Sequence, residues 1–420
     1  MQRFVIHGGE KLHGNVRISG AKNSALPIIA ASLISAKKIV LNNIPDLVDV
    51  RTMIELVQYI GSEVEFKDNT LVIQTPKIKN FDAPYDIVRK MRASYYVLGA
   101  LVARAGRAKV SLPGGCAIGP RPIDLHIKGL KALGVDINVE EGFINAKSKK
   151  LIGHDVNLQG PKGTSVGATI NVMIAATGAE GETVIGSAAC EPEVVDVANF
   201  LNTMGHDVSG QGTHTIVVKG QGSAKDVDYA VIPDRIETGT FAVAAVLTKG
   251  EINITDCCPE HLASVLDKLE EAGGKVTRKE KSVIVNGYSS RQAINIYVAP
   301  FPGFPTDMQA QFMALLAMVP GTSTIKETIF ENRFMQAVEL MRMGADITIE
   351  GDTAVINGVK KLSNAILMAS DLRASASLVL AGLAATGKTV VRRIYHLDRG
   401  YENFEKKLRS LGARIERQPE

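Results

Sequence analysis

Cysteine is scarce in this chain, with four residues among 420, and no Cys-x-x-Cys pair occurs. So few cysteines do not make a disulfide framework, and their spacing does not favour a zinc site. The sequence also lacks an HExxH motif, an apolar run long enough to cross a bilayer, and a basic-then-apolar leader at its start. We therefore expect a cytoplasmic protein with reduced thiols, without a metal ion, a cofactor or a membrane partner.

An excess of charge of one sign is also missing. Lysine and arginine number 48 against 44 acidic residues, a net charge of +4, and no basic run marks a nucleic-acid partner. Any anionic partner must therefore be met by a local cluster of basic residues. The length of 420 residues with 45% hydrophobic residues predicts two domains, and nothing in the sequence indicates an oligomeric state.

What the sequence does contain is a sixfold internal repeat. An apolar residue and a glycine end the second helix of each unit and recur 68 to 73 residues apart, at Gly61, Gly134, Gly205, Gly273, Gly344 and Gly412. Each interval holds an alanine-rich helix, a turn, a strand, a second helix and paired strands. The repeat predicts an α/β fold of six βαβ-type units, three in each domain.

The two helices of a unit differ in pattern. Ser375–Ala385, Ala168–Ala176 and Gly239–Leu247 have no polar face, which predicts helices buried on every side. His261–Ala272 instead alternates at helical period and has one wet face. We expect the first helices to pack inward with the sheets and second helices outside them, and the midpoint to fall near 228–233.

Basic residues stand where several of the inward helices should begin, among them Lys22, Arg92, Arg235 and Arg373. A helix N-terminus carries partial positive charge, so a cation there is unfavourable unless an anion is bound. The alternative is that each one pairs with a neighbouring acid. For the set we favour an anion site, which would suit substrate phosphates and carboxylates.

The segment 382–389 matches the phosphate-loop pattern GxxxxGK[ST]. That pattern requires strand, loop and then helix, whereas here an apolar helix comes first and a strand follows. We interpret Gly387-Lys388 as a turn of the repeat.

The loop at 113–122 has the composition of a mobile lid, with three glycines and three prolines around Cys116 and Arg121. A thiol in such a loop beside basic residues has a lowered pKa and is reactive. A structural cysteine, which usually sits in an apolar helix or strand, is the alternative.

With that loop, several further motifs resemble the UDP-N-acetylglucosamine 1-carboxyvinyltransferases, a family of enolpyruvyl transferases. The resemblance covers essentially the whole chain, and its motifs occur in family order. They are Ser19-Gly20-Ala21-Lys22-Asn23-Ser24, Met91-Arg92-Ala93-Ser94, Phe304-Pro305-Thr306-Asp307-Met308-Gln309, Phe330-Glu331-Asn332-Arg333-Phe334, Asp371-Leu372-Arg373 and His396-Leu397-Asp398-Arg399-Gly400-Tyr401.

The resemblance implies two inside-out α/β barrel domains of three units each, residues 22–230 and residues 1–21 with 231–420, with the active site in the cleft between them. It implies transfer of enolpyruvyl from phosphoenolpyruvate to the 3-hydroxyl of UDP-N-acetylglucosamine, the first committed step of peptidoglycan synthesis. A role in cell shape, the cell cycle and cell division, and inhibition by fosfomycin, would follow.

The resemblance also implies residue roles. Asp307 would be the general base for the sugar hydroxyl, and Cys116 the thiol that protonates the methylene carbon of phosphoenolpyruvate. Lys22, Arg121 and Arg399 would hold the phosphate and carboxylate of phosphoenolpyruvate. Further substrate contacts would be Asn23, Arg92, Arg121, Pro122, Ile123, Asp124, Leu125, Ser165, Val166, Gly167, Ile329, Arg333 and Arg373, with Asp371 as a second acid.

Two alternatives remain open. The sister family that acts on shikimate 3-phosphate shares the six-unit barrel and the basic cleft, but lacks the Pro-Gly-Gly-Cys lid. The second alternative is a catalytically silent paralogue that only binds a UDP-sugar. Such a paralogue would not need to retain Cys116, Asp307, Lys22 and Arg399, yet all four are present.

Overall fold

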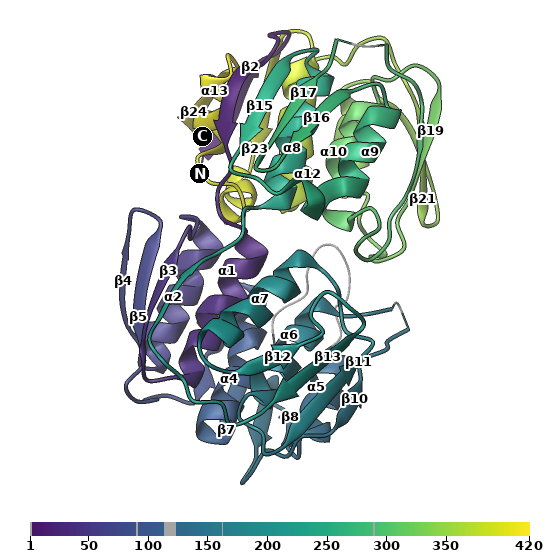
Figure 1. Ribbon diagram of the computed structural model, residues 1–420. Coiled ribbons are helices and arrows are strands. Elements are labelled where there is room, and N and C mark those ends of the chain that lie inside the picture. The colour runs from purple at the N-terminus through teal and green to yellow at the C-terminus, as the bar shows by residue number, and fades with distance from the viewer. Residues whose placement is uncertain (1, 90, 113–122, 162, 289) are drawn as a thin grey trace. The chain divides into compact units, whose positions relative to one another are not determined.

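The computed structural model describes residues 2–89, 91–112, 123–161, 163–288 and 290–420. Helices and strands alternate along this chain, as the sequence pattern predicts (Figure 1). None of the helices in the described ranges is long and apolar enough to cross a membrane.

The chain divides into two compact units, each with a hydrophobic core of its own. The central unit comprises the described residues of 20–232, and the terminal unit comprises 2–19 together with 233–420. The core of the central unit extends from Ala25 to Val231, and that of the terminal unit from Phe4 to Ile415. The two units are therefore described one at a time.

Three four-stranded sheets build the central unit, each with one parallel pair followed by two antiparallel pairs. This order is the one that a βαβ crossover followed by a hairpin produces. In sheet order the strands are β14 (Val227–Ala230), β3 (Lys38–Asn42), β5 (Thr70–Gln74) and β4 (Glu63–Lys67); β6 (Asp82–Ala83), β7 (Arg107–Ser111), β9 (Phe143–Lys147) and β8 (Asp136–Glu140); and β10 (Asp155–Asn157), β11 (Glu182–Gly186), β13 (Thr215–Lys219) and β12 (Asp207–Ser209).

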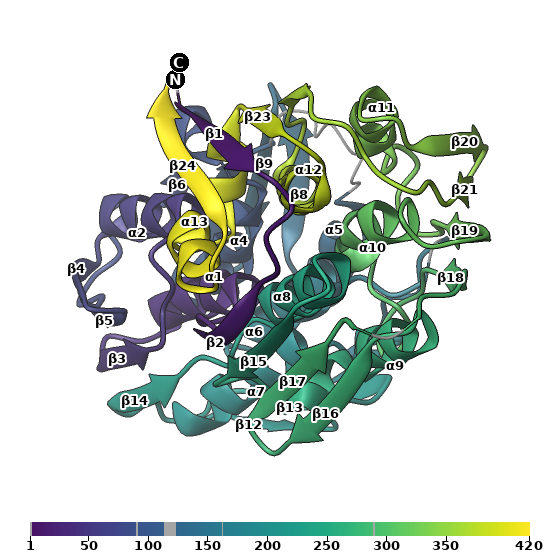
Figure 2. The same cartoon turned by 90° about the horizontal axis from the view of Figure 1, so that it is seen from above.

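Three further sheets of the same plan build the terminal unit. The N- and C-terminal strands β1 and β24 pair side by side, so that the two ends of the chain meet in one sheet (Figure 2). In sheet order the strands are β2 (His13–Arg17), β15 (Glu251–Thr255), β17 (Ser282–Asn286) and β16 (Lys275–Lys279); β18 (Asn295–Tyr297), β19 (Thr322–Lys326), β21 (Thr353–Asn357) and β20 (Asp346–Glu350); and β22 (Ile366–Met368), β23 (Lys388–Arg392), β1 (Gln2–His7) and β24 (Arg414–Pro419).

Two parallel strands each lie in a different unit from the helix that follows them in the chain. Strand β2 directly precedes the first helix of the central unit, yet it pairs with β15 in the terminal unit. Strand β14 directly precedes the first helix after residue 232, yet it pairs with β3 in the central unit. Each unit thus obtains one strand from the chain segment that leads into the other.

The first helix of each repeat is buried within its unit, among the sheets, as the absence of a polar face predicts. In the central unit these helices are α1 (Lys22–Ala31), α4 (Tyr96–Ala105) and α6 (Val166–Ala176), and in the terminal unit they are α8 (Arg235–Leu247), α10 (Gln309–Leu316) and α12 (Leu372–Ala384). Every residue of Ala168–Ala176 and Gly239–Leu247 is buried, which confirms the prediction for those segments.

The second helix of each repeat has one exposed face. These helices are α2 (Val48–Ile60), α5 (Asp124–Ala132), α7 (Pro192–Thr203), α9 (Ala263–Glu271), α11 (Met335–Arg342) and α13 (Phe404–Ser410). The helix predicted at His261–Ala272 is instead a 3-10 turn, η3 (Pro259–Leu262), followed directly by α9. The remaining short elements are α3 (Tyr85–Val88), η1 (Ser32–Ile34), η2 (Arg92–Tyr95), η4 (Thr306–Met308) and η5 (Ile394–Arg399).

The six repeat glycines all follow these second helices, and all have positive φ, from 85° at Gly134 to 132° at Gly61. A residue with positive φ often follows a helix, and glycine adopts this conformation without the steric strain that a Cβ would cause. Gly387 also has positive φ, between α12 and β23, so the phosphate-loop look-alike is a helix-to-strand turn. Both predictions from the repeat are confirmed.

Candidate active site

A carboxylate held by two guanidinium groups lies where α10 begins. Asp307 is in the 3-10 turn η4, which leads directly into α10. Its Oδ1 accepts a hydrogen bond from Arg333 Nη2 at 2.8 Å, and its Oδ2 accepts one from Arg373 Nη2 at 2.9 Å. The two arginine side chains are 5% and 4% exposed, whereas that of Asp307 is 26% exposed. The acid is thus the part of this cluster that a ligand can reach.

Arg373 is held on several sides. Burial lowers the pKa of its guanidinium, but the charge and hydrogen bond of Asp307, together with Tyr401 and Asp234, raise that pKa above its ordinary value. The guanidinium lies 5.4 Å from the centre of the Tyr401 ring. The Tyr401 hydroxyl in turn lies 2.9 Å from Thr240 Oγ1 and 3.2 Å from Gln311 Nε2, both on neighbouring inner helices. Arg373 is therefore a fixed cation.

Glu327, which the sequence argument missed, ties this turn to the next loop. It is 3% exposed. Its Oε2 accepts from Thr306 Oγ1 at 2.7 Å, and its Oε1 accepts from the backbone N–H groups of Ile329 at 2.8 Å and Phe330 at 3.2 Å. The predicted sugar neighbour Ile329 is thereby held in a fixed relation to Thr306 and Asp307.

Asp371 is the N-cap of α12. Its Oδ1 accepts from the backbone N–H groups of Arg373 and Ala374 at 2.8 and 3.0 Å. Capping alone accounts for an aspartate at this position. The same bonds fix the first turn of α12, which carries Arg373.

Arg399 is the last residue of η5 and is half-buried. Burial lowers the pKa of the nearby His396 imidazole, and the positive charge of Arg399 lowers that pKa further. The preceding residue, Asp398, is gripped by Arg417 of β24 through two bonds, at 3.0 and 2.7 Å. The C-terminal strand therefore anchors the turn that carries Arg399.

In the central unit, Lys22 is the first residue of α1, followed by the half-buried Asn23. Its Nζ lies 3.4 Å from Asp49 Oδ2, and the two side chains are 12% and 3% exposed. Asp49, another residue that the sequence argument missed, stands in the first turn of α2. Lys22 and Arg373 thus each have an acidic neighbour in this structure, and the predicted anion site stays a prediction.

Two further predicted contacts are helix starts in the same unit. Ser165 caps α6 by accepting from Ala168 N–H at 3.2 Å. Helix geometry leaves the N–H groups of Val166 and Gly167, in the first turn of α6, without an intrahelical partner. Ile123 precedes α5, whose first residues are Asp124 and Leu125. Cys116, Arg121, Pro122 and the side chain of Arg92 lie outside the described residues, and their predicted roles stay predictions.

The structure thus brings Asp307, Arg333 and Arg373 into one cluster. Lys22, Ser165 and Asp371 lie at helix starts, as the sequence predicts. Asp49 and Glu327 carry no sequence signal that separates them from ordinary acids, since only a three-dimensional contact identifies them. Tyr401 belonged to a recognised motif, but its packing against Arg373 could not be inferred from that motif.

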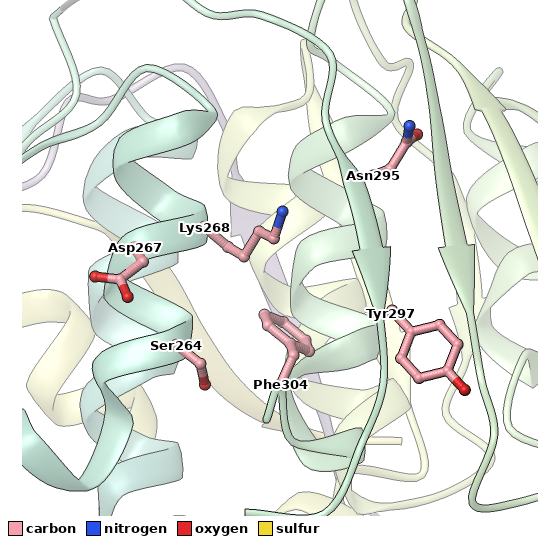
Figure 3. A pocket seen from close by; sticks show the side chains of 6 residues that line it. All are labelled: Ser264, Asp267, Lys268, Asn295, Tyr297 and Phe304. Carbon is pink, nitrogen blue, oxygen red and sulfur yellow. The ribbon is translucent and has the colours of Figure 1, made fainter. Parts of the chain in front are cut away.

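A separate open groove of about 280 Å³ lies between α9 and β18 and is shown in Figure 3. It is lined by Ser264, Asp267, Lys268, Asn295, Tyr297 and Phe304. None of the predicted site residues takes part in it. Within the described ranges, no three His, Cys, Asp or Glu side chains gather as metal ligands do.

Known proteins resemble this chain over its whole length. The sequence profile of the EPSP synthase family (3-phosphoshikimate 1-carboxyvinyltransferase) matches residues 6–408. The UDP-N-acetylglucosamine 1-carboxyvinyltransferase of Desulfosudis oleivorans is 52% identical over 417 residues, and the one of Idiomarina loihiensis is 53% identical over 419 residues. Each alignment covers 99% of both chains.

Solved structures agree on the fold. The crystal structure of the enolpyruvyl transferase NikO from Streptomyces tendae matches with a TM-score of 0.89 at 27% identity, over 99% of both chains. EPSP synthase from Acinetobacter baumannii matches with a TM-score of 0.78 at 18% identity over 100% of both chains, which shows the fold alone. The predicted two-domain α/β fold of the enolpyruvyl transferases is therefore confirmed. The chain is an enzyme of the EPSP synthase family and belongs, within that family, with the UDP-N-acetylglucosamine 1-carboxyvinyltransferases.

Proposed function

We propose that this enzyme transfers the enolpyruvyl group of phosphoenolpyruvate to the 3-hydroxyl of UDP-N-acetylglucosamine and releases phosphate. The observation that carries the proposal is 52–53% identity, over 99% of both chains, with relatives of that name. Asp307 supports it, since it combines a partly exposed carboxylate with two buried cations that fix its position.

The reaction is an addition followed by an elimination. Asp307 takes the proton of the sugar 3-hydroxyl, whose oxygen bonds to the second carbon of phosphoenolpyruvate while the methylene carbon gains a proton. Cys116 supplies that proton, and its thiolate can also bond to the second carbon of phosphoenolpyruvate. The tetrahedral adduct then loses phosphate from its second carbon while the Cys116 thiolate takes a proton back from the methyl group, which restores the carbon–carbon double bond.

The cations serve the two anionic groups of phosphoenolpyruvate. Lys22, Arg121 and Arg399 bind its phosphate and carboxylate, with Arg333 and Arg373 behind Asp307. Because Lys22 lies at the start of α1 with Asp49 beside it, its ammonium group is held at a helix terminus that itself favours anions.

The remaining contacts hold the nucleotide sugar. Residues 121–125 meet the uridine, Ser165, Val166 and Gly167 the diphosphate, and Ile329 flanks the sugar, with Asn23 and Arg92 as further contacts. We propose a cytoplasmic enzyme of peptidoglycan synthesis that supports cell shape, the cell cycle and cell division. Fosfomycin would inhibit the enzyme by alkylating Cys116. Domains at 22–230 and at 1–21 with 231–420 would each contribute substrate-binding residues.

Release of phosphate from phosphoenolpyruvate, measured with each acceptor in turn, tests the proposal. Phosphate release that depends on UDP-N-acetylglucosamine is expected. Release with shikimate 3-phosphate instead would assign the enzyme to the sister activity. Binding of the UDP-sugar without any phosphate release would make the protein a silent paralogue.

A further inference from the structure

The side chain of Asn171 is enclosed where two inner helices of the central unit cross. It lies in the middle of α6 and is fully buried. Its Oδ1 accepts from the backbone N–H of Gly99 in α4 at 2.7 Å, and its Nδ2 donates to the carbonyl of Tyr95 at 3.1 Å. A Cβ at Gly99 would collide with Asn171 Oδ1. This close approach explains a glycine inside α4, where it would otherwise cost about 1 kcal/mol.

The hydrogen bonds of Asn171 with the Gly99 N–H and the Tyr95 carbonyl determine which atom of its side-chain amide is oxygen and which is nitrogen. In the flipped amide, the NH2 group would face the Gly99 N–H and the oxygen would face the Tyr95 carbonyl, so both bonds would become repulsive. The second hydrogen on Asn171 Nδ2 is therefore available to His126, whose Nδ1 lies 3.0 Å away. His126 Nδ1 must accept, and the neutral ring then carries its hydrogen on Nε2.

The Nε2 edge of His126 lies against the first turn of α6. A Cβ at Gly167 would come within 3.1 Å of Nε2 and 3.2 Å of Cε1, so a side chain there would press on this edge of the ring. The imidazole is 8% exposed, and the Tyr95 ring packs against it with 5.7 Å between ring centres. The ring is therefore held in place beside the N–H groups of Val166 and Gly167.

We propose that Asn171 is a positioning residue, which holds His126 with its hydrogen on Nε2 so that His126 donates a hydrogen bond to the diphosphate of the nucleotide sugar. This inference rests on the proposed function, because that function puts the diphosphate at Ser165–Gly167. A ring with the hydrogen on Nδ1 would turn a lone pair toward the anion and repel it. The tautomer thus decides whether this wall of the site attracts or repels phosphate.

The tautomer of His126 can be measured directly in the wild-type enzyme. Long-range nitrogen–proton NMR correlations on enzyme labelled at histidine distinguish a ring protonated on Nε2 from one protonated on Nδ1, and loss of the signal in His126→Gln assigns it. Protonation on Nε2 is expected. A wild-type ring with its hydrogen on Nδ1, or with hydrogens on both nitrogens at neutral pH, would overturn the proposal.

Two substitutions at His126 separate the two nitrogens. Glutamine can place an amide N–H near the position of Nε2, whereas the shorter asparagine reaches only the position of Nδ1. We expect UDP-N-acetylglucosamine to bind His126→Gln within a few-fold of wild type and His126→Asn about 10- to 100-fold more weakly, as for the loss of one hydrogen bond to a charged group. His154→Gln, at an exposed histidine, is the control. Equal weakening in both His126 variants would contradict the proposal.

Asn171→Leu tests the positioning residue itself. Leucine has a similar volume but offers His126 Nδ1 no hydrogen-bond donor and no charge, so the ring is no longer held with its hydrogen on Nε2. The KM for the UDP-sugar should rise while the KM for phosphoenolpyruvate stays unchanged. A folded variant with an unchanged His126 NMR signal would refute the role of Asn171, and if the variant does not fold, the His126 pair decides. Failure of the proposed function would instead appear as wild-type enzyme that does not bind the UDP-sugar, whatever the tautomer.

Discussion

The Asp307 carboxylate lies 2.9 Å from the guanidinium of Arg373, which stands 66 positions later in the chain and on a different helix. Arg333 holds the other carboxylate oxygen at 2.8 Å. Two hydrogen bonds to separate oxygens fix both the position and the plane of a carboxylate, and with them the direction of its remaining lone pairs. The Arg333 and Arg373 guanidinium groups therefore orient Asp307, and Asp307 in turn supplies the counter-charge for these two buried cations.

Asp307→Asn should accordingly impair both catalysis and stability. We expect kcat to fall by about 10²- to 10⁴-fold, as for loss of a general base. We expect the free energy of unfolding to fall by about 3 kcal/mol, because two buried guanidinium groups lose their counter-charge. Phosphate release and urea unfolding measure the two effects. Asp352→Asn, with a side chain 55% exposed, is the control, and an active Asp307→Asn enzyme would exclude Asp307 as the base.

Glu327 offers a test of the loop that carries Ile329. Glu327→Ala leaves one hydroxyl and two backbone N–H groups without their acceptor, so we expect a loss of about 2 kcal/mol or more in unfolding free energy. The KM for the UDP-sugar should also rise. Glu327→Gln keeps an oxygen for both N–H groups and should lose less than half as much. If the two variants behave alike in both assays, the bonds to Glu327 do not set the loop.

Arg417 links the C-terminal strand to the turn that carries Arg399. The Arg417 guanidinium donates two hydrogen bonds to Asp398, and its Nε donates one to Glu405 at 2.9 Å. The single ammonium group of a lysine cannot make all three bonds in this geometry. Arg417→Lys should therefore lower kcat/KM for phosphoenolpyruvate about tenfold through misplacement of Arg399. Arg414→Lys, an exposed residue of the same strand, should leave it unchanged. A normal kcat/KM in Arg417→Lys would show that the position of Arg399 does not depend on this anchor.

His206 should make the stability of the central unit depend on pH. Burial lowers the pKa of its imidazole, and both ring nitrogens lack a hydrogen-bond partner among the described residues. The unfolded chain then takes up a proton at higher pH than the folded one, so stability is full above the ordinary histidine pKa and falls as pH drops below it. His206→Gln should reduce the loss in unfolding free energy between pH 7.5 and 5, as urea titrations can measure, whereas His154→Gln should not. The same pH dependence in His206→Gln and wild type would contradict this assignment.

The cysteines should differ sharply toward an epoxide. Burial raises the pKa of the Cys257 thiol to about 11 and also raises that of Cys190, so both thiols stay protonated and unreactive at neutral pH. Fosfomycin at limiting concentration should therefore modify Cys116, and peptide mass spectrometry should find Cys190 and Cys257 unchanged. Inhibited enzyme with an unmodified Cys116 would contradict the proposed thiol chemistry.

The local features of this fold could be predicted from the sequence, because each depends on a few neighbouring residues. A helix without a polar face must be buried, and a glycine after a helix marks a left-handed turn, as at Gly61 and Gly134. The motif residues Asp307, Arg333 and Arg373 could likewise be recognised one at a time.

The pairing of distant segments could not be predicted in this way. No residue of β2 or β14 indicates that the strand pairs in a different unit from the helix that follows it, since both units offer a similar parallel neighbour. Glu327 and Asp49 resemble surface acids until a folded partner is seen. The tautomer of His126 depends on Gly99 and Tyr95 through Asn171, and that chain of bonds has no signature in sequence.

The places of β2 and β14 in the chain set the order in which the two units can be completed during synthesis at the ribosome. The central unit holds every strand that it needs once Val227–Ala230 has emerged, so it can close while the rest of the chain is still being made. Strand β2 has no partner until Glu251–Thr255 is made, and β1 has none until Lys388–Arg392 and then Arg414–Pro419 are made. A premature stop before β24 would therefore release a finished central unit joined to an open sheet edge, the kind of species that chaperones bind and proteases remove.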